Sequence, residues 1–95
     1  MFRPRRTAII EGPLTYETLR AWLVTELARR VDCAESEVDT AKAFDAYGLD
    51  SVAYVEFSGA LEKAVEYRLS PATLFDHETI DSLADYLARE LLLRR

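Results

Sequence analysis

The sequence predicts an all-α fold, a small four-helix bundle of three long helices and one short helix. Three segments carry apolar residues at three- and four-residue spacing, and no segment alternates apolar and polar residues as a half-buried strand would. The chain has 95 residues, of which 49% are hydrophobic, which allows one modest core and no second domain. We therefore expect one helical domain over residues 15–93, preceded by a flexible lead-in over residues 1–14.

The first long helix is predicted over residues 16–31. Thr15 is a favourable N-cap, and Glu17 places a negative charge near the positive end of the helix dipole. The apolar residues that follow fall on one stripe: Leu19, Trp22, Leu23, Leu27 and Val31. This stripe should face the core, with the Trp22 ring as part of the packing.

A long acidic connection, residues 32–50, separates this helix from the next. We expect Val38 and Phe44 to anchor the connection by turning into the core. Seven acids lie within residues 32–56 against one base, Lys42. This balance repels the phosphates of nucleic acid and suits a partner with a basic docking surface, although the same acids can also simply keep a loop solvated.

Three further helices complete the predicted bundle. One is expected over residues 51–66, a short one over residues 72–75 after the start signal Ser70-Pro71, and the last from residue 80 after the cap Thr79. The last helix has a clean apolar stripe, formed by Ile80, Leu83, Ala84, Leu87, Ala88 and Leu91.

Several kinds of site are disfavoured. Cys33 is the only cysteine and His77 the only histidine, so we expect no metal site. No apolar run is long enough to cross a membrane, and the N-terminus lacks the apolar segment of a secretory signal. A hydrolase built on Ser51, His77 and an aspartate would need an oxyanion hole that a small bundle does not readily offer. We expect a cytoplasmic monomer that is not an enzyme and binds neither nucleic acid nor membrane.

The distinctive local feature is the entry into the second helix. Gly48 permits a tight turn, Leu49 can anchor inward, and Asp50 and Ser51 stand at the helix start. A serine at this position presents its hydroxyl to the active site of another protein. The alternative is that Asp50 and Ser51 only cap free amide groups of the helix. From these residues alone, both interpretations stay open.

Residues 43–52, which contain Gly48-Leu49-Asp50-Ser51, closely resemble the modification site of acyl carrier proteins, where Gly-x-Asp-Ser precedes a helix. Residues 69–84, with their Ser-Pro, Leu-Phe-Asp and Thr-Ile steps, resemble the second half of carrier domains from polyketide synthases. The two stretches lie at the family's spacing, and the resemblance covers about residues 15–92.

The resemblance implies a function in covalent carriage. Ser51 would receive 4′-phosphopantetheine from coenzyme A through a phosphopantetheinyl transferase, and the thiol of this arm would hold acyl groups as thioesters. Gly48, Leu49 and Asp50 match the residues that precede the family serine. The expected partner contacts lie on the second helix, at Val52, Val55, Glu56 and Glu62, although all four can equally be plain packing or solvated charge.

The partners that the resemblance implies are an acyl-loading enzyme, either an acyltransferase or a fatty acyl-AMP ligase, and a ketosynthase or another downstream synthase enzyme. Fatty-acid carriers usually have an acid and an apolar residue where this chain has Ala53 and Gly59, which favours polyketide-type partners. Asp50 argues against an amino acid load. Residues 20–24 resemble the first helix of carriers that are paired with fatty acyl-AMP ligases.

The main alternative from another class is a small helical adaptor that binds a basic partner surface noncovalently through its acidic middle. Covalent modification of Ser51 distinguishes the two, because an adaptor gains no prosthetic group.

Overall fold

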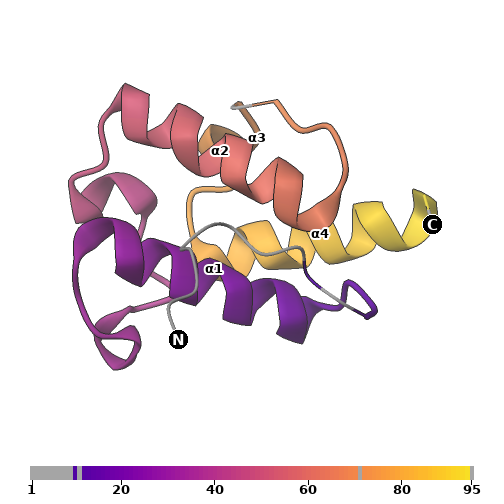
Figure 1. Cartoon of the computed structure of the whole chain (residues 1–95), viewed down its shortest axis with the longest axis horizontal. Coiled ribbons are helices and arrows are strands. Elements are labelled where there is room, and N and C mark those ends of the chain that lie inside the picture. The colour runs from indigo at the N-terminus through magenta and orange to yellow at the C-terminus, as the bar shows by residue number, and fades with distance from the viewer. Residues whose placement is uncertain (1–9, 11, 71, 95) are drawn as a thin grey trace, which may run out of the picture.

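The computed structural model describes residues 10, 12–70 and 72–94, and every helix predicted from the sequence is present in it (Figure 1). Over the described residues the chain is all-helical, without a strand. The elements follow in the order α1 (Tyr16–Val31), η1 (Glu35–Glu37), η2 (Phe44–Tyr47), α2 (Ser51–Val65), α3 (Ala72–Asp76) and α4 (Ile80–Arg94), where η denotes a short 3₁₀ helix. The predicted fold class is thus confirmed.

Helix α1 begins where its capping residues predict. The Thr15 hydroxyl accepts a hydrogen bond from the Thr18 backbone N–H, and the Thr18 side chain accepts one from the Thr15 N–H in return. The apolar stripe of α1 packs against α4 (Figure 1). The fully buried side chains of these two helices form the centre of the core: Leu19, Leu23, Leu27, Ile80, Leu83, Ala84, Leu87 and Leu91.

The long acidic connection is anchored in the way the sequence suggested. The Phe44 side chain is completely buried and makes an edge contact with Phe57 of α2, with ring centroids 5.5 Å apart. The Phe44 N–H donates to the Glu78 carbonyl at 2.7 Å, which ties the connection to the segment before α4. Val38 is half-buried against the same core. The connection therefore delivers the chain to the start of α2 at a fixed place.

Helix α3 is short and helix α4 is long, as the sequence predicts. Leu74 of α3 is fully buried, while its neighbour Phe75 is 54% exposed, because a helix of barely more than one turn can turn only one of two adjacent side chains inward. Helix α4 begins after Thr79, whose hydroxyl accepts the Ser82 N–H at 3.0 Å.

The N-terminal boundary differs from the prediction. Leu14, which the sequence placed in a flexible lead-in over residues 1–14, is buried in the core. It occupies the position of a hydrophobic staple, one residue before the Thr15 cap. The Ile10 N–H donates to the Ala64 carbonyl at 2.9 Å, one of the carbonyls that the end of α2 leaves without a partner. The rest of the predicted lead-in, residues 1–9 and residue 11, lies outside the described residues.

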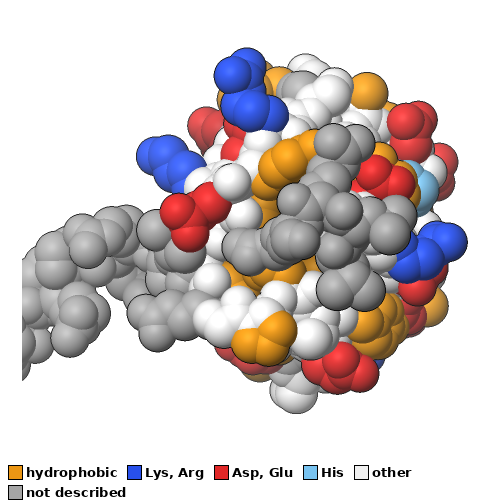
Figure 2. Space-filling model, turned by 90° about the vertical axis from the view of Figure 1, so that its right-hand side faces the viewer, with side chains coloured by type: hydrophobic (Ala, Val, Ile, Leu, Met, Phe, Trp, Pro, Cys, Tyr) orange, Lys and Arg blue, Asp and Glu red, His pale blue; other side chains and the backbone are white. Residues whose placement is uncertain are grey.

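None of the helices within the described residues combines the length and the apolar character that a membrane span requires. On the face seen in Figure 2, acidic and basic side chains of the described residues lie interspersed among apolar ones.

Candidate functional site

The turn that leads into α2 is fixed by Gly48 and Leu49. Gly48 has a φ of 85°, a left-handed conformation that glycine adopts without strain, and its N–H donates to the Asp45 carbonyl at 3.0 Å. Leu49 is half-buried and packs against the core, as expected of an anchor. The next two residues are therefore held at the surface where α2 begins.

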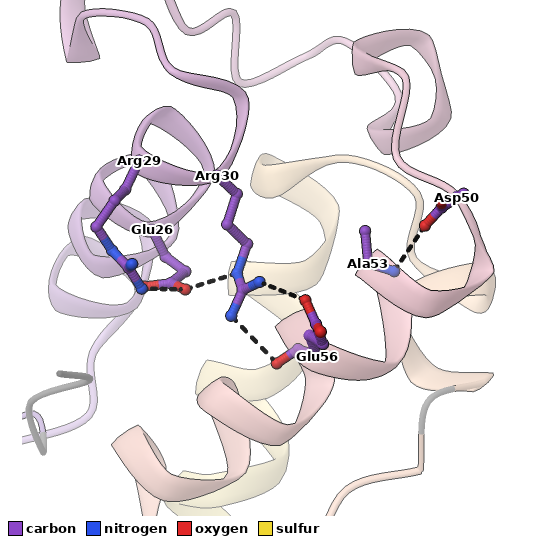
Figure 3. Close-up of polar contacts among 6 residues, drawn as sticks. All are labelled: Glu26, Arg29, Arg30, Asp50, Ala53 and Glu56. Carbon is purple, nitrogen blue, oxygen red and sulfur yellow. Dashed lines mark hydrogen bonds and ion pairs between the residues drawn. The ribbon is translucent and has the colours of Figure 1, made fainter.

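Asp50 alone caps α2. Its carboxylate Oδ1 accepts the Ala53 N–H at 2.8 Å (Figure 3). Ser51 is exposed, and within the described residues its hydroxyl has no hydrogen-bond partner. The capping interpretation accounts for Asp50 and leaves the Ser51 hydroxyl without a structural role. No general base is within hydrogen-bond distance of that hydroxyl, so a serine hydrolase has no support in the described part of the chain.

Apolar side chains surround Ser51 on the surface. Val52 is 64% exposed and Val55 56% exposed, so neither side chain contributes to the packing of the core. On the other side of Ser51, Phe75 of α3 stacks on Tyr54 with ring centroids 4.4 Å apart and an interplanar angle of 17°. Tyr54 itself is buried, as its place in the predicted stripe requires. Phe75 is not among the site residues predicted from the sequence, because two adjacent apolar residues in a helix of five residues do not show which of them faces the core.

Glu56 is tied to α1. Arg30 Nη1 lies 3.3 Å from Glu56 Oε1, and Arg30 Nε lies 2.7 Å from Glu26 Oε2 (Figure 3). Arg29 adds a second ion pair to Glu26 at 2.8 Å. Glu26 is only 4% exposed, and its burial is tolerated because both arginines satisfy its oxygens. This cluster is not among the residues predicted from the sequence, although an acid with arginines three and four residues later is a local signal for it.

Glu62 also has an internal partner. Its side chain is half-buried and accepts a hydrogen bond from the Leu69 N–H, which holds the connection between α2 and α3 against α2. Neither of the sequence-based interpretations of Glu62, partner contact or plain solvated charge, included this role.

The other side of the site carries free acids. Asp45 of η2, Asp76 of α3 and Glu78 are exposed, and none of the three carboxylates forms an ion pair or side-chain hydrogen bond within the described ranges. Burial raises the pKa of the Tyr54 hydroxyl, and the negative charges of Asp45 and Glu78 raise that pKa further. These two carboxylates therefore act on the same corner of the molecule as the Tyr54–Phe75 stack.

The part of the chain that the structure describes contains no candidate metal site. No three or more His, Cys, Asp or Glu side chains there are placed to hold an ion together. The His77 ring stacks on Tyr86, with centroids 4.1 Å apart.

Comparison with known proteins identifies the family. The family described as "Phosphopantetheine attachment site" matches residues 21–87, most of the chain and all of the site described above. The chain belongs to this family. It is accordingly a carrier domain and not an enzyme, and the group that the family carries is a covalently attached 4′-phosphopantetheine.

Individual relatives agree with this assignment. The chain is 36% identical over 70 residues to one of the subunits of the phenolphthiocerol/phthiocerol polyketide synthase of Mycobacterium tuberculosis, a match that covers 74% of the chain and 4% of the synthase polypeptide. The chain spans only about 1% to 4% of the length of the polyketide synthases that it matches.

Among solved structures, a free-standing peptidyl carrier protein of Acinetobacter baumannii is 33% identical, with a TM-score of 0.77, covering 82% of this chain and 98% of that one. An acyl carrier protein of Anabaena sp. PCC 7120 with a variant phosphopantetheinylation-site sequence is 29% identical, with a TM-score of 0.78, covering 87% and 94%. The fold and the site thus define a carrier domain like those of polyketide synthases.

Proposed function

We propose that Ser51 is the residue that carries the phosphopantetheine group, and that the chain presents acyl intermediates on this arm to the enzymes of a polyketide-type pathway. The observation that carries the proposal is the setting of the Ser51 hydroxyl. Within the described residues it is exposed and without a partner at the start of a helix that Asp50 already caps, and the exposed side chains of Val52 and Val55 stand beside it. The surrounding turn has no need of that oxygen, and a separate enzyme has free access to it.

The residues of the chain support the attachment without performing it. Gly48 and Leu49 fix the position of the turn, and Asp50 holds the first turn of α2 in shape. In the transfer, the Ser51 oxygen forms a bond to the phosphorus that bears the pantetheine arm, and its proton passes to a base of the transferase. The pyrophosphate P–O bond of coenzyme A breaks, and adenosine 3′,5′-bisphosphate leaves. The bound group supplies a flexible tether with a terminal thiol. Tethering raises the effective concentration of an acyl group at a partner's active site.

The proposed partners are a phosphopantetheinyl transferase, an acyl-loading enzyme and a ketosynthase or another downstream synthase enzyme. The relatives that support a polyketide-type setting are large synthases of which this chain spans a small part. Asp50 before the serine favours an acyl load over an amino acid. The single free cysteine, Cys33, is compatible with action in the cytoplasm, where coenzyme A is available.

Intact mass spectrometry tests the attachment directly. The chain is incubated with coenzyme A and a broad-specificity phosphopantetheinyl transferase, and we expect a gain of one phosphopantetheinyl group. Ser51→Ala should abolish the gain. Ser36→Ala and Ser82→Ala, which alter two other exposed serines, should leave it unchanged.

Two results would contradict the proposal. If the folded chain gains no mass with any competent transferase, the result would favour the alternative function, a noncovalent adaptor. A gain that persists in Ser51→Ala would move the attachment to another residue.

A further inference from the structure

Within the described residues, the exposed apolar surface is concentrated around Ser51. Among the described residues, the large hydrophobic side chains that are exposed are Val52, Val55 and Phe75. An α-helix turns about 100° per residue, so Val55 lies roughly 40° from Ser51 around the axis of α2, and Tyr54, beneath Phe75, lies roughly 60° away on the opposite side. Ser51 therefore stands between two apolar flanks.

The acids on the α2 side of this surface are already engaged within the protein. Glu56 pairs with Arg30 of α1, and Glu62 accepts the Leu69 N–H. The Arg30 guanidinium lies between Glu56 and the buried Glu26, so that a basic partner residue approaching Glu56 also meets a positive charge. Arg30 therefore offsets the negative charge of Glu56, and Glu62 is held half-buried against the connection between α2 and α3 rather than free to reach a partner.

The acids on the α3 side are free. Asp45, Asp76 and Glu78 are exposed and form no ion pair within the described part of the chain. Asp76 directly follows Phe75. Asp45 directly follows Phe44, whose ring centroid lies 6.5 Å from that of Tyr54, and the Glu78 carbonyl accepts the Phe44 N–H at 2.7 Å. The negative charge available to a partner is thus concentrated on one side of the apolar surface, next to Phe75.

We propose that partner enzymes dock on the apolar surface formed by Val52, Val55 and Phe75, and that their basic residues contact Asp45, Asp76 and Glu78 rather than Glu56 and Glu62. This inference rests on the proposed attachment at Ser51 and specifies the partner surface that fits it. The matching surface of the partner enzyme is apolar at its centre and basic only along the edge that contacts α3 and η2.

The two parts of this docking surface make different contributions. Burial of the valines and Phe75 against the partner strengthens the complex, and salt affects this contribution little. The exposed carboxylates attract basic residues of the partner over about a Debye length, and salt screens this attraction. Charge complementarity at the edge of an interface mainly raises the rate of association.

Kinetics of the phosphopantetheinyl transfer measure both contributions, because the transferase must dock beside Ser51. The probe is one broad-specificity transferase with coenzyme A, and the readout is kcat/KM at low and high salt. Val55→Ser and Phe75→Ser should each lower kcat/KM about tenfold, through KM and at both salt concentrations. The triple variant Asp45→Asn, Asp76→Asn, Glu78→Gln should lower kcat/KM about fivefold at low salt and have little effect at high salt.

The control removes the same net charge elsewhere. A triple variant with Glu17→Gln, Asp32→Asn and Glu66→Gln alters exposed acids of the first turn of α1 and of the ends of α1 and α2, whose carboxylates likewise form no ion pair within the described residues. It should stay within twofold of the unaltered chain. Glu56→Gln and Glu62→Gln should also stay within twofold. Thermal unfolding verifies that each variant is folded, and Val52→Ser, an exposed position within a helix, replaces Phe75→Ser if that variant unfolds.

Three outcomes would overturn the inference while leaving attachment at Ser51 intact. The first is a kcat/KM that is unchanged by Val55→Ser and Val52→Ser. The second is a larger loss from Glu56→Gln or Glu62→Gln than from the triple variant beside Phe75. The third is a stable dimer in sedimentation that Val55→Ser dissociates, which would assign the surface to a second copy of the chain. An unaltered chain that is never modified would instead overturn the proposed function itself.

Discussion

The dipeptide Asp-Ser stands at the start of two helices in this bundle, and the structure uses the two copies in different ways. Asp50-Ser51 begins α2, and Asp81-Ser82 lies in the first turn of α4. Both serines are exposed, and neither hydroxyl has a hydrogen-bond partner within the described residues. The difference lies in what each aspartate does and in what surrounds each serine.

Asp81 joins three segments of the chain. The Tyr16 hydroxyl and Arg20 Nε donate to its Oδ1 at 3.2 and 3.1 Å, and the Thr40 hydroxyl donates to its Oδ2 at 3.1 Å. The backbone follows the same arrangement, because the Asp81 N–H donates to the Thr40 carbonyl at 3.1 Å. The start of α4 is therefore a structural joint between α1, the acidic connection and α4.

Asp50, in contrast, serves only its own helix. Its single side-chain hydrogen bond goes to Ala53, and the residues around Ser51 are exposed valines rather than polar partners from other segments. The comparison shows that an exposed Asp-Ser pair at a helix start is not by itself a functional signal. What distinguishes Ser51 is the surrounding surface, which is apolar and makes few contacts that the fold requires.

The largest effect should come from the structural joint. Asp81→Ala removes an ion pair and two hydroxyl hydrogen bonds, and we expect a loss of about 1.5 kcal/mol in the free energy of unfolding, limited by the partial exposure of the pair. Urea denaturation at neutral pH measures this loss. A variant as stable as the unaltered chain would show that the joint contributes nothing and would remove the contrast with Asp50.

The same joint predicts a pH dependence. Although partial burial raises the pKa of Asp81, the hydrogen bonds from Arg20, Thr40 and Tyr16 and the charge of Arg20 outweigh it and lower the pKa below the ordinary value of 3.8. A lowered pKa means that the carboxylate stabilises the fold above pH 3.8 and loses this contribution as the pH falls through the folded-state pKa. The stability difference between the unaltered chain and Asp81→Ala should be constant near neutral pH and shrink below pH 3.8. A difference that grows in acid would contradict the sign of this shift.

The cap of α2 should have a smaller effect. Asp50→Ala leaves the Ala53 N–H without its acceptor, and the typical cost of losing an N-cap is about 1 kcal/mol. Asp50→Asn is the matched control, because asparagine caps almost equally well. If both variants unfold at the same urea concentration as the unaltered chain, the cap does not hold the start of α2, and the fixed presentation of Ser51 loses its support.

Much of this fold could be predicted from the sequence because its signals are local. The caps Thr15 and Thr79 and the apolar stripes follow from neighbours a few residues apart, and the structure confirms them. The role of Ser51 depended on a family resemblance, since its own neighbours left both capping and presentation open.

The features that were missed depend on contacts between distant segments. Glu26 pairs with Arg29 and Arg30, of which Arg30 also reaches Glu56 of α2. Glu62 is held by a backbone N–H in the next connection. Leu14 was placed outside the domain because a single apolar residue before a cap gives no periodicity. The spacing of residues along a helix does not show which charged side chains will bond to a neighbouring segment. Which acids are free and which are engaged is therefore visible only in the structure.

The smallest expected effect on stability is also the sharpest test of the comparison. Ser51→Ala and Ser82→Ala each remove an exposed hydroxyl without a partner and introduce a good helix former, so each should change the free energy of unfolding by no more than about 0.5 kcal/mol. Equilibrium urea denaturation of both variants beside the unaltered chain measures this. Because the two serines should matter equally little to the fold, a loss of phosphopantetheinylation in Ser51→Ala alone would have to come from chemistry at that oxygen. If Ser51→Ala instead destabilises the chain by clearly more than Ser82→Ala, the hydroxyl has a structural role after all, and loss of modification would no longer identify Ser51 as the attachment residue.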